Sequence, residues 1–325
     1  MKNKPYISFV VTARNDNYGE NLINRINTFI KVLSFLVEKH KLPSELVIVE
    51  YNPPLNKPRL SDELNINKSN KFLSYRFIEV PETFHKNLEG SNKMPIFEFV
   101  AKNIGIHRAS GEFILSMNPD IILSKDLIKW IAKMKLQKNT FYRTNRHDIT
   151  DNWFDQKNSA QKILAHASSN VFMVFLNNKT QYRSWLAWIK RVLTSRNKKS
   201  ILMCPILNKK TDGTDETVLH ERAAGDFLLM HRDLWEKAGG YDTASVHGFV
   251  DGYILYFLYC LNVEQKILSY PIYHISHKVR QTNRPKIEMS IYRKTINKML
   301  SQKIPYKEKN ENWGVPNMKF KEDII

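Results

Sequence analysis

The stretch Ala101–Asp120 reads AKNIGIHRASGEFILSMNPD, and it decides the fold class. Its first half predicts the last turns of a helix that ends near Gly111, and Phe113–Ser116 predicts a short buried strand. The triplet Asn118-Pro119-Asp120 follows, so one carboxylate stands at the carboxyl end of that strand. Such a carboxylate suits Mg²⁺ or Mn²⁺, which prefer oxygen ligands, although the same triplet is also typical of a simple turn.

Upstream of this stretch, short apolar strands alternate with helices. Strands are predicted at Lys4–Thr12, Leu46–Val49 and Leu73–Val80. Apolar residues at helical spacing predict a helix over Leu22–Leu33, and a second helix is predicted over Phe97–Arg108. This order is typical of an α/β sheet that is largely parallel. In such sheets the ligand lies outside the carboxyl ends of the strands.

Downstream, the pattern continues and then changes to a basic tail. The expected elements are a helix over Asp126–Leu136, a strand over Val171–Leu176 and a strand followed by a helix over Gly225–Gly240. An apolar helix over Gly252–Leu261 and a strand or loop over Pro271–His277 follow. The tail Lys278–Ile325 carries twelve Lys/Arg against five Asp/Glu, and Ile287–Leu300 predicts a helix in it. We expect a domain over residues 1–280 and a basic helical extension over 281–325, which covers the core or mediates self-association.

Composition and charge narrow the class of protein. Of the 325 residues, 42% are hydrophobic and 11% aromatic, which excludes wholesale disorder. Lys+Arg 50 against Asp+Glu 32 gives a net charge of +18, which suggests nucleic acid, an anionic membrane surface or a phosphorylated small molecule as the partner. Cys204 and Cys260 exclude a disulfide scaffold and fit a reducing compartment. With Ile7–Val11 too short for a signal-peptide core and no apolar stretch of about 20 residues, a cytoplasmic protein is expected.

The common nucleotide and hydrolase motifs are absent from the sequence. It contains no phosphate-binding G-x-x-x-x-G-K-[ST] loop, no G-x-G-x-x-G, no H-E-x-x-H and no G-x-S-x-G. A repeated basic–aromatic pattern and a known nucleic-acid-binding module are absent as well, so no nucleic-acid partner is expected. The readings as an ATPase, a dinucleotide enzyme or a serine hydrolase therefore lose their support.

Two later segments carry candidate chemistry. The first, Gly225–Asp242, is followed by Asp251, which opens an apolar helix and is either a helix cap or a general base. The second, Tyr273–Arg280, reads YHISHKVR and offers imidazoles for a metal and a basic pair for phosphate. A structural role for these histidines is the alternative. Arg143 and Arg146 contact phosphate or acceptor, or form structural salt bridges.

In this order, these segments resemble the GT-A class of nucleotide-sugar-dependent glycosyltransferases, and in particular its family-2-like branch. The likeness runs from about Tyr6 to Arg280. Its matched motifs are the opening strand and loop, the A-R-N-x-G helix with its strand, the D-x-D motif, the G-G-(F/Y)-D pattern, the E-D base motif and the late H-x-x-R, found at Phe9–Asn15, Ala101–Ile114, Asn118–Asp120, Gly225–Asp242, Val250–Asp251 and His277–Arg280. Three positions depart from the family: Lys102 replaces an arginine, Asn118 the first acid of D-x-D, and Val250 a glutamate.

The resemblance implies a GT-A fold, which is a Rossmann-like, mostly parallel central sheet flanked by helices. It implies transfer of a sugar from a nucleoside-diphosphate sugar, expected to be a UDP-sugar, to a glycan or lipid-linked acceptor with inversion. The implied setting is bacterial capsule or lipopolysaccharide-type polysaccharide synthesis.

The resemblance also implies the site residues. Asp251 would be the base, and Asp120 and His277 would hold Mn²⁺ or Mg²⁺. A metal-independent variant, in which Lys/Arg neutralise the diphosphate, stays open. Glu50 would read the nucleobase, and the other residues implied in binding the donor are Thr12, Ala13, Arg14, Lys102, Asn103, Asn118, Asp120, Gly225, Asp226 and Arg280.

Several alternatives remain open at this point. The basic segment Arg183–Lys199, with Trp185 and Trp188, fits peripheral contact with the anionic inner face of the cytoplasmic membrane, or a helix that packs its tryptophans on the domain. A nucleotidyltransferase is the rival enzyme, but it usually carries a glycine-rich loop after its first strand, and Thr12–Gly19 is poor in glycine. A degenerate, inactive GT-A domain is a further reading.

Overall fold

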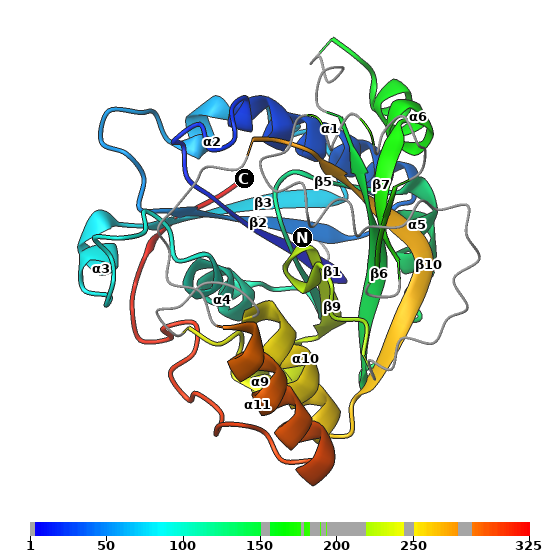
Figure 1. The fold of residues 1–325 in the computed structure, drawn as a ribbon. Helices are drawn as coiled ribbons and strands as arrows, with labels where there is room; N and C mark the ends of the chain where they lie inside the picture. Colours follow the sequence, from blue (N-terminus) through cyan, green and yellow to red (C-terminus); the bar gives the residue numbers. More distant parts are fainter. Residues whose placement is uncertain are drawn as a thin grey trace.

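The computed structural model describes residues 4–150, 157–176, 179–182, 219–243, 250–278 and 288–325, together with Ile189 and Leu193. These residues form an eleven-stranded sheet with helices on both faces (Figure 1). The strands are β1 (Ile7–Ala13), β2 (Ser44–Tyr51), β3 (Leu73–Val80), β4 (Phe113–Met117), β5 (Ile121–Leu123), β6 (Thr140–Ile149), β7 (Val171–Leu176), β8 (Lys179–Tyr182), β9 (Phe227–His231), β10 (Glu264–Ile275) and β11 (Lys321–Ile324). The helices are α1 (Leu22–Lys39), α2 (Leu60–Glu63), α3 (Glu82–Lys86), α4 (Glu98–Arg108), α5 (Lys125–Ile131), α6 (Ala160–Ser169), the 3₁₀ turn η1 (Ala224–Asp226), α9 (Arg232–Ala238), α10 (Val250–Cys260) and α11 (Met289–Gln302).

The sheet follows the order β11-β3-β2-β1-β4-β9-β6-β10-β5, and the hairpin β7–β8 extends from β6. Strands β3, β2, β1, β4, β6 and β10 run in one direction, whereas β11, β9 and β5 run in the other. The expected α/β class, with a mostly parallel central sheet flanked by helices, is confirmed. The carboxyl ends of the six strands that run together therefore lie at one edge of the sheet, which is where a ligand is expected.

Each face of the sheet has its own apolar core. One core packs α1, α5 and α6 against the sheet, and the other packs α4, α9, α10 and α11 against the opposite face (Figure 1). Strands β1 and β2 are buried along their whole length, as continuous apolar strands covered on both faces should be. On the second face, a Cβ at Gly105 would lie 2.6 Å from Val10 Cγ1 and 2.7 Å from Val49 Cγ2, so a glycine lets α4 lie directly on β1 and β2.

Strands β5 and β6 were not expected as strands from the sequence. In β6, Arg143 is fully buried and Arg146 is partly buried, so the strand does not show a simple apolar pattern. The expected strand or loop at Pro271–His277 is the end of the longer β10, whose register against β6 shifts between Leu268 and Ile272. Pro271 lies within that shift, where its missing N–H costs no ladder hydrogen bond.

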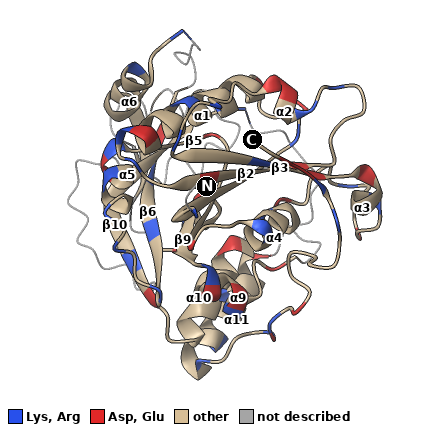
Figure 2. Cartoon of the chain, turned by 180° about the vertical axis from the view of Figure 1, so that it is seen from behind, with Lys and Arg blue, Asp and Glu red and all other residues tan. Residues whose placement is uncertain are grey.

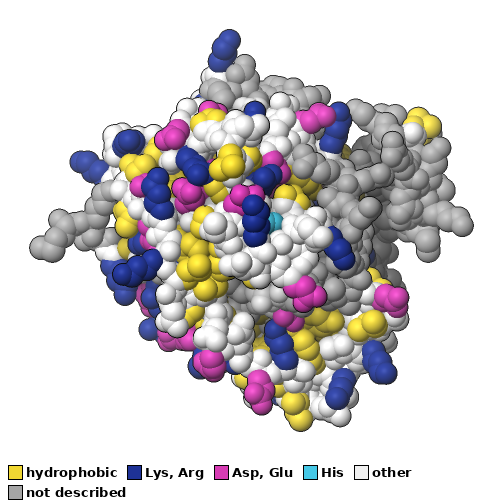
Figure 3. Space-filling model, turned by 90° about the vertical axis from the view of Figure 1, so that its left-hand side faces the viewer, with side chains coloured by type: hydrophobic (Ala, Val, Ile, Leu, Met, Phe, Trp, Pro, Cys, Tyr) yellow, Lys and Arg dark blue, Asp and Glu magenta, His cyan; other side chains and the backbone are white. Residues whose placement is uncertain are grey.

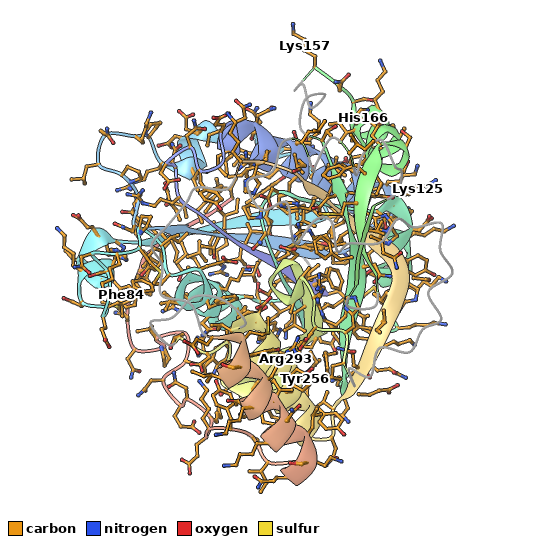
Figure 4. All side chains as sticks on the ribbon, in the orientation of Figure 1. Phe84, Lys125, Lys157, His166, Tyr256 and Arg293 are labelled. Atoms are coloured by element: carbon orange, nitrogen blue, oxygen red, sulfur yellow. The ribbon has the colours of Figure 1, made fainter. Side chains whose placement is uncertain are left out.

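The carboxyl-terminal residues pack closely on the rest of the chain. The helix expected in the basic tail is confirmed as α11, which packs on α10 through Tyr292, Ile296 and Met299 (Figure 4 labels Tyr256 and Arg293 on this pair). Trp313 is only 4% exposed. Strand β11 then pairs antiparallel with β3 at the edge of the sheet. A separate extension over 281–325 stays a prediction.

In the part of the chain that the structure describes, positive and negative side chains are interleaved rather than gathered. Lys and Arg occur on several helices and on β6, interleaved with Asp and Glu (Figure 2), and the face in Figure 3 shows the same mixture. Among the described helices, none is both long enough and apolar enough to cross a membrane. The basic segment Arg183–Lys199 lies outside the described residues, except for Ile189 and Leu193.

Candidate functional site

A cavity of about 280 Å³ lies at the carboxyl ends of β1, β4, β6 and β10. The β1–α1 loop and the Asn118-Pro119-Asp120 triplet form much of its wall. Its lining residues are Thr12, Ala13, Arg14, Asp16, Tyr18, Leu22, Pro95, Ile96, Glu98, Asn118, Pro119, Asp120, Arg146, Asp226, His274 and His277. Seven of these were expected from the sequence, namely Thr12, Ala13, Arg14, Asn118, Asp120, Asp226 and His277.

One carboxylate and two imidazoles meet in this cavity. Asp120 Oδ2 lies 3.1 Å from His277 Nε2 and 3.9 Å from His274 Nε2, and the three ligand atoms lie within 4.8 Å of one another. Strand pairing explains why they meet, because β5 begins directly after Asp120 and its first residue, Ile121, pairs with His274 of β10. The backbone N–H of Ile275 also donates to the Asp120 carbonyl at 3.0 Å.

The surroundings of Asp120 favour its ionised form. Burial alone would raise the pKa of this carboxyl, but the hydrogen bond from His277 and the charges of His274 and Arg25 hold the pKa well below its usual range. Arg25 comes from α1, and its Nε lies 3.9 Å from Asp120 Oδ2. The other oxygen, Asp120 Oδ1, is buried and has no hydrogen-bond partner among the described residues. A buried, ionised oxygen without a partner fits a cation ligand.

Arg146 connects the cluster to the other side of the cavity. Its guanidinium lies 2.7 Å from Asp148 Oδ1 and 2.6 Å from Asp226 Oδ2. Asp148 in turn lies 3.3 Å from His274 Nδ1 and therefore orients the ring whose Nε2 faces Asp120. Burial opposes ionisation of Asp148, but His274 and Arg146 lower its pKa to about 2. Arg146 was expected either to contact phosphate or acceptor or to form structural salt bridges. It forms salt bridges, and it also lines the cavity.

Asn118 has a structural reason to be an amide rather than the acid of the D-x-D motif. Its Oδ1 accepts from Lys102 Nζ at 2.7 Å, and its Nδ2 donates to Asp226 Oδ1 at 2.7 Å. An amide can serve a cation and a carboxylate at once, whereas an aspartate here would bring two carboxylates within hydrogen-bond distance. Lys102 also donates to Glu98 Oε1 at 2.7 Å and to the Gly225 carbonyl at 2.8 Å. Its side chain is 0% exposed, so its charge is used inside the protein.

Asp251 lies in the first turn of α10 and does not line the cavity. Its Oδ2 accepts from the backbone N–H of Gly225 at 2.7 Å, so the carboxylate is tied to η1. Burial raises the pKa of Asp251, although the Gly225 N–H and the charges of Arg143 and Lys102 act against this rise. Asp251 is thus joined through Gly225 to Asp226, which lines the cavity, and a carboxylate with a raised pKa is a candidate for proton transfer.

Other expected site residues lie behind the cavity. Glu50, at the end of β2, accepts from the Leu60 N–H at 3.2 Å through Oε2, while its Oε1 is buried without a partner in the described chain. Burial raises the pKa of Glu50 to about 7. Asn103 is buried, and its amide exchanges hydrogen bonds of 2.9 and 2.8 Å with the Tyr241 backbone. Arg280 lies outside the described residues.

Sequence reasoning assigned His277 to the metal but not His274. The signal was present, because both histidines stand in the YHISH run. Asp148 and Arg25 gave no such signal, since each reaches the cluster only through the folded sheet and helix α1. Arg143, the other arginine left open, contacts backbone carbonyls behind η1 and does not line the cavity.

Comparisons with known proteins give a distant likeness. No protein-family model and no curated protein sequence matches the chain. The fold is similar to the catalytic domain of Drosophila beta1,4galactosyltransferase 7 in complex with xylobiose, with a TM-score of 0.37 and 8% identity over 90% of this chain and 79% of that one. It is also similar to S. aureus TarS 1–349, with a TM-score of 0.45 and 12% identity over 94% of this chain and 67% of that one. Likenesses this distant carry no conclusion about substrate or mechanism.

Proposed function

We propose that the chain is a glycosyltransferase that moves a sugar from a nucleoside-diphosphate sugar to an acceptor hydroxyl and depends on a divalent cation. The charge of the cavity is the observation that carries this proposal. Although the chain has a net charge of +18, the cavity is lined by four carboxylates and two arginines: Asp16, Glu98, Asp120 and Asp226 against Arg14 and Arg146. Both arginines are already paired with carboxylates, at 3.1 Å for Arg14 and 2.6 Å for Arg146. Among the described residues the lining thus has more carboxylates than arginines, which favours a diphosphate that binds together with a cation.

Asp120, His274 and His277 are the residues that would hold the cation. The donor set offers one ionised carboxylate with a buried, unpartnered oxygen and two imidazoles close by. It fits Mn²⁺ better than Mg²⁺, because Mg²⁺ prefers oxygen ligands. When bound, such an ion neutralises the charge that develops on the departing nucleoside diphosphate. A metal-dependent site is preferred to a metal-independent one, because Lys102 donates to Glu98, Asn118 and Gly225 and does not line the cavity, where it could neutralise a diphosphate.

Asp251 would act as the general base. Burial raises its pKa, which suits proton transfer from an acceptor hydroxyl, and the charges of Arg143 and Lys102 act against that rise. Attack of the hydroxyl oxygen on the anomeric carbon breaks the bond to the diphosphate oxygen, and the hydroxyl proton goes to Asp251. A single displacement of this kind inverts the anomeric centre. The Gly225 N–H fixes the orientation of the Asp251 carboxylate throughout.

The finer assignments follow from the resemblance to GT-A enzymes. The nucleoside would lie near Thr12, Ala13 and Arg14, with Asp226 on the sugar side. The resemblance assigns recognition of the base to Glu50, which is buried and does not line the cavity. A UDP-sugar is the proposed donor, and a glycan or lipid-linked acceptor in capsule or lipopolysaccharide-type synthesis is the proposed setting. Asn118 would act from the cavity wall, and Asn103 and Lys102 from outside the lining. Contact with an anionic membrane is part of the same proposal.

Release of nucleoside diphosphate from a panel of nucleotide sugars tests the proposed function. We expect release with one or a few donors in Mn²⁺ or Mg²⁺, and loss of release in EDTA. No release across the panel would indicate a degenerate domain. Release of pyrophosphate from a nucleoside triphosphate and a sugar phosphate would instead identify a nucleotidyltransferase.

A further inference from the structure

Arg143 is a buried arginine that binds one short segment of backbone. Its side chain is on β6 and is 0% exposed. Nε donates to the His220 carbonyl at 3.3 Å, and the two terminal nitrogens donate to the carbonyls of Arg222 at 2.7 Å and Ala224 at 3.5 Å. One guanidinium thus spans three alternate carbonyls that lead directly into η1.

The charge of Arg143 has no carboxylate within salt-bridge distance among the described residues. Burial lowers its pKa to about 10, and the nearby charges of Asp251 and Asp226 act in the opposite direction. A buried charge is costly unless something compensates it. Here the carbonyl dipoles and these two carboxylates of the site provide the compensation, so the arginine and the site depend on each other.

The turn that Arg143 holds joins the two halves of the site. Ala223 has a left-handed backbone with φ 55, and η1 follows it. Within η1, the Gly225 N–H donates to Asp251 and the Gly225 carbonyl accepts from Lys102. Asp226 accepts from Asn118 at 2.7 Å and from Arg146 at 2.6 Å in the wall of the cavity. A shift of this turn would therefore move Asp251 relative to the cavity.

We propose that Arg143 is a positioning residue, which sets the distance between Asp251 and the cavity by clamping two carbonyls before η1 and the carbonyl of its first residue, Ala224. The inference rests on the proposed function, because it gives Asp251 the role of base. Other contacts hold the start of the same segment: the His220 N–H donates to Gln265 Oε1 at 2.7 Å, and Tyr256 and Tyr292 donate to Glu221 at 2.9 and 2.8 Å. With that start held, loss of Arg143 should loosen the turn without unfolding the segment.

Arg108 provides a matched control. It also clamps three carbonyls of one segment, those of Gly314 at 2.7 Å, Val315 at 3.0 Å and Met318 at 2.7 Å, but it does so in the carboxyl-terminal tail. Arg108 has the Ile104 carbonyl and Glu322 as further partners, so its loss is at least as severe for the fold. Arg143→Met and Arg108→Met each remove one such clamp with little change in side-chain length. Arg143→Lys keeps the charge but cannot span three carbonyls.

The test compares kinetics and amide exchange in the full chain. In Arg143→Met we expect kcat to fall about 10²-fold, with KM for the donor and Kd for the nucleoside diphosphate within about twofold of wild type. The amides of residues 219–226 should exchange faster. Arg108→Met should leave kcat and these amides unchanged. If Arg143→Met does not fold, Arg143→Lys carries the same test with a smaller fall.

A double variant separates positioning from general destabilisation. In the Asp251→Asn background, Arg143→Met should have almost no further effect on kcat, since the group that it positions is gone. The proposal is overturned if the two substitutions multiply, if kcat and nucleotide affinity fall together, or if exchange in 219–226 does not change. Should wild type release no nucleotide from any donor, the proposed function fails, while the exchange experiment still decides whether Arg143 holds the turn.

Discussion

Glu45 and Glu50 lie at opposite ends of β2, and their carboxylates differ in the hydrogen bonds that they accept. Both side chains are buried, with Glu45 at 3% and Glu50 at 4% exposed. Glu45 accepts from Ser8 Oγ at 2.7 Å, from the Ser110 N–H at 2.8 Å and from Arg76 Nε at 3.0 Å. Glu50 accepts from the Leu60 N–H at 3.2 Å, and its Oε1 has no partner within the described ranges.

The two ends of the sheet differ in how fully they satisfy a buried carboxylate. At the amino end the fold supplies enough donors to lower the pKa of Glu45 against the effect of burial. At the carboxyl end burial prevails and raises the pKa of Glu50 to about 7. Thr12 Oγ1 and Asp120 Oδ1 are further buried atoms without a partner at this end of the described chain. A buried carboxylate whose pKa is raised and which lacks a full set of donors supports the proposal of a binding site at this end.

The largest effect is expected at Asp251. Asp251→Asn should lower kcat by about 10²–10⁴-fold, because the amide cannot accept the acceptor proton. Nucleotide affinity, measured by calorimetry, should stay unchanged. The control is Asp233→Asn, which changes the acid in the first turn of α9 and should leave both quantities unchanged. Equal loss of activity and nucleotide binding in Asp251→Asn would make Asp251 a structural residue.

The next largest effect is expected on Mn²⁺ affinity, which should respond to a substitution at His274 but not at His231. His274→Gln should weaken Mn²⁺ binding by about 10-fold or more, since an imidazole that faces Asp120 is lost. His231→Gln, at the end of β9 on the amino side of the sheet, should bind Mn²⁺ as wild type does. Electron paramagnetic resonance of free Mn²⁺ measures both without any enzyme assay. Equal affinities in wild type and His274→Gln would remove His274 from the cation site.

The smallest effect is on stability, and it has opposite signs at the two ends of β2. The pKa of Glu45 is lowered in the folded state, so Glu45 stabilises the fold above its ordinary pKa of 4.5 and loses this contribution as pH falls. The pKa of Glu50 is raised to about 7 in the folded state, so the folded state holds a proton that the unfolded state releases. The stability of the fold therefore falls as pH rises from 4.5 to about 7.

Two glutamine variants test these signs by denaturant unfolding between pH 4 and 8. Glu45→Gln should cost about 1–3 kcal/mol at pH 7 and less at pH 4. Glu50→Gln should flatten the decline between pH 4.5 and 7. Parallel pH profiles for the two variants would contradict the contrast between the ends of the sheet.

Much of the frame of the site was predictable, because apolar runs mark strands and the residues that follow them mark the carboxyl ends. Asp120 was predicted at such an end, whereas the role of His277 was implied by the resemblance to GT-A enzymes; both residues line the cavity. His274 needed the register of β5 against β10, which no local pattern encodes. Arg25 reaches the cluster only through the packing of α1, and β6 was not predicted because Arg143 and Arg146 interrupt its apolar pattern. Asn118 stands where the D-x-D motif has an acid, and its contacts with Lys102 and Asp226 explain why. The sequence alone did not show these contacts.

The affinity of the wild-type chain for UDP, with and without Mn²⁺, tests the central claim most directly. The cavity has more carboxylates than arginines, so UDP should bind at least about 10-fold more weakly in EDTA than in Mn²⁺. Asp120→Asn should remove most of that difference, because it removes the one ionised carboxylate of the cluster. Equal UDP affinity in EDTA and in Mn²⁺ would contradict the account of a cation-dependent site at the carboxyl end of the sheet.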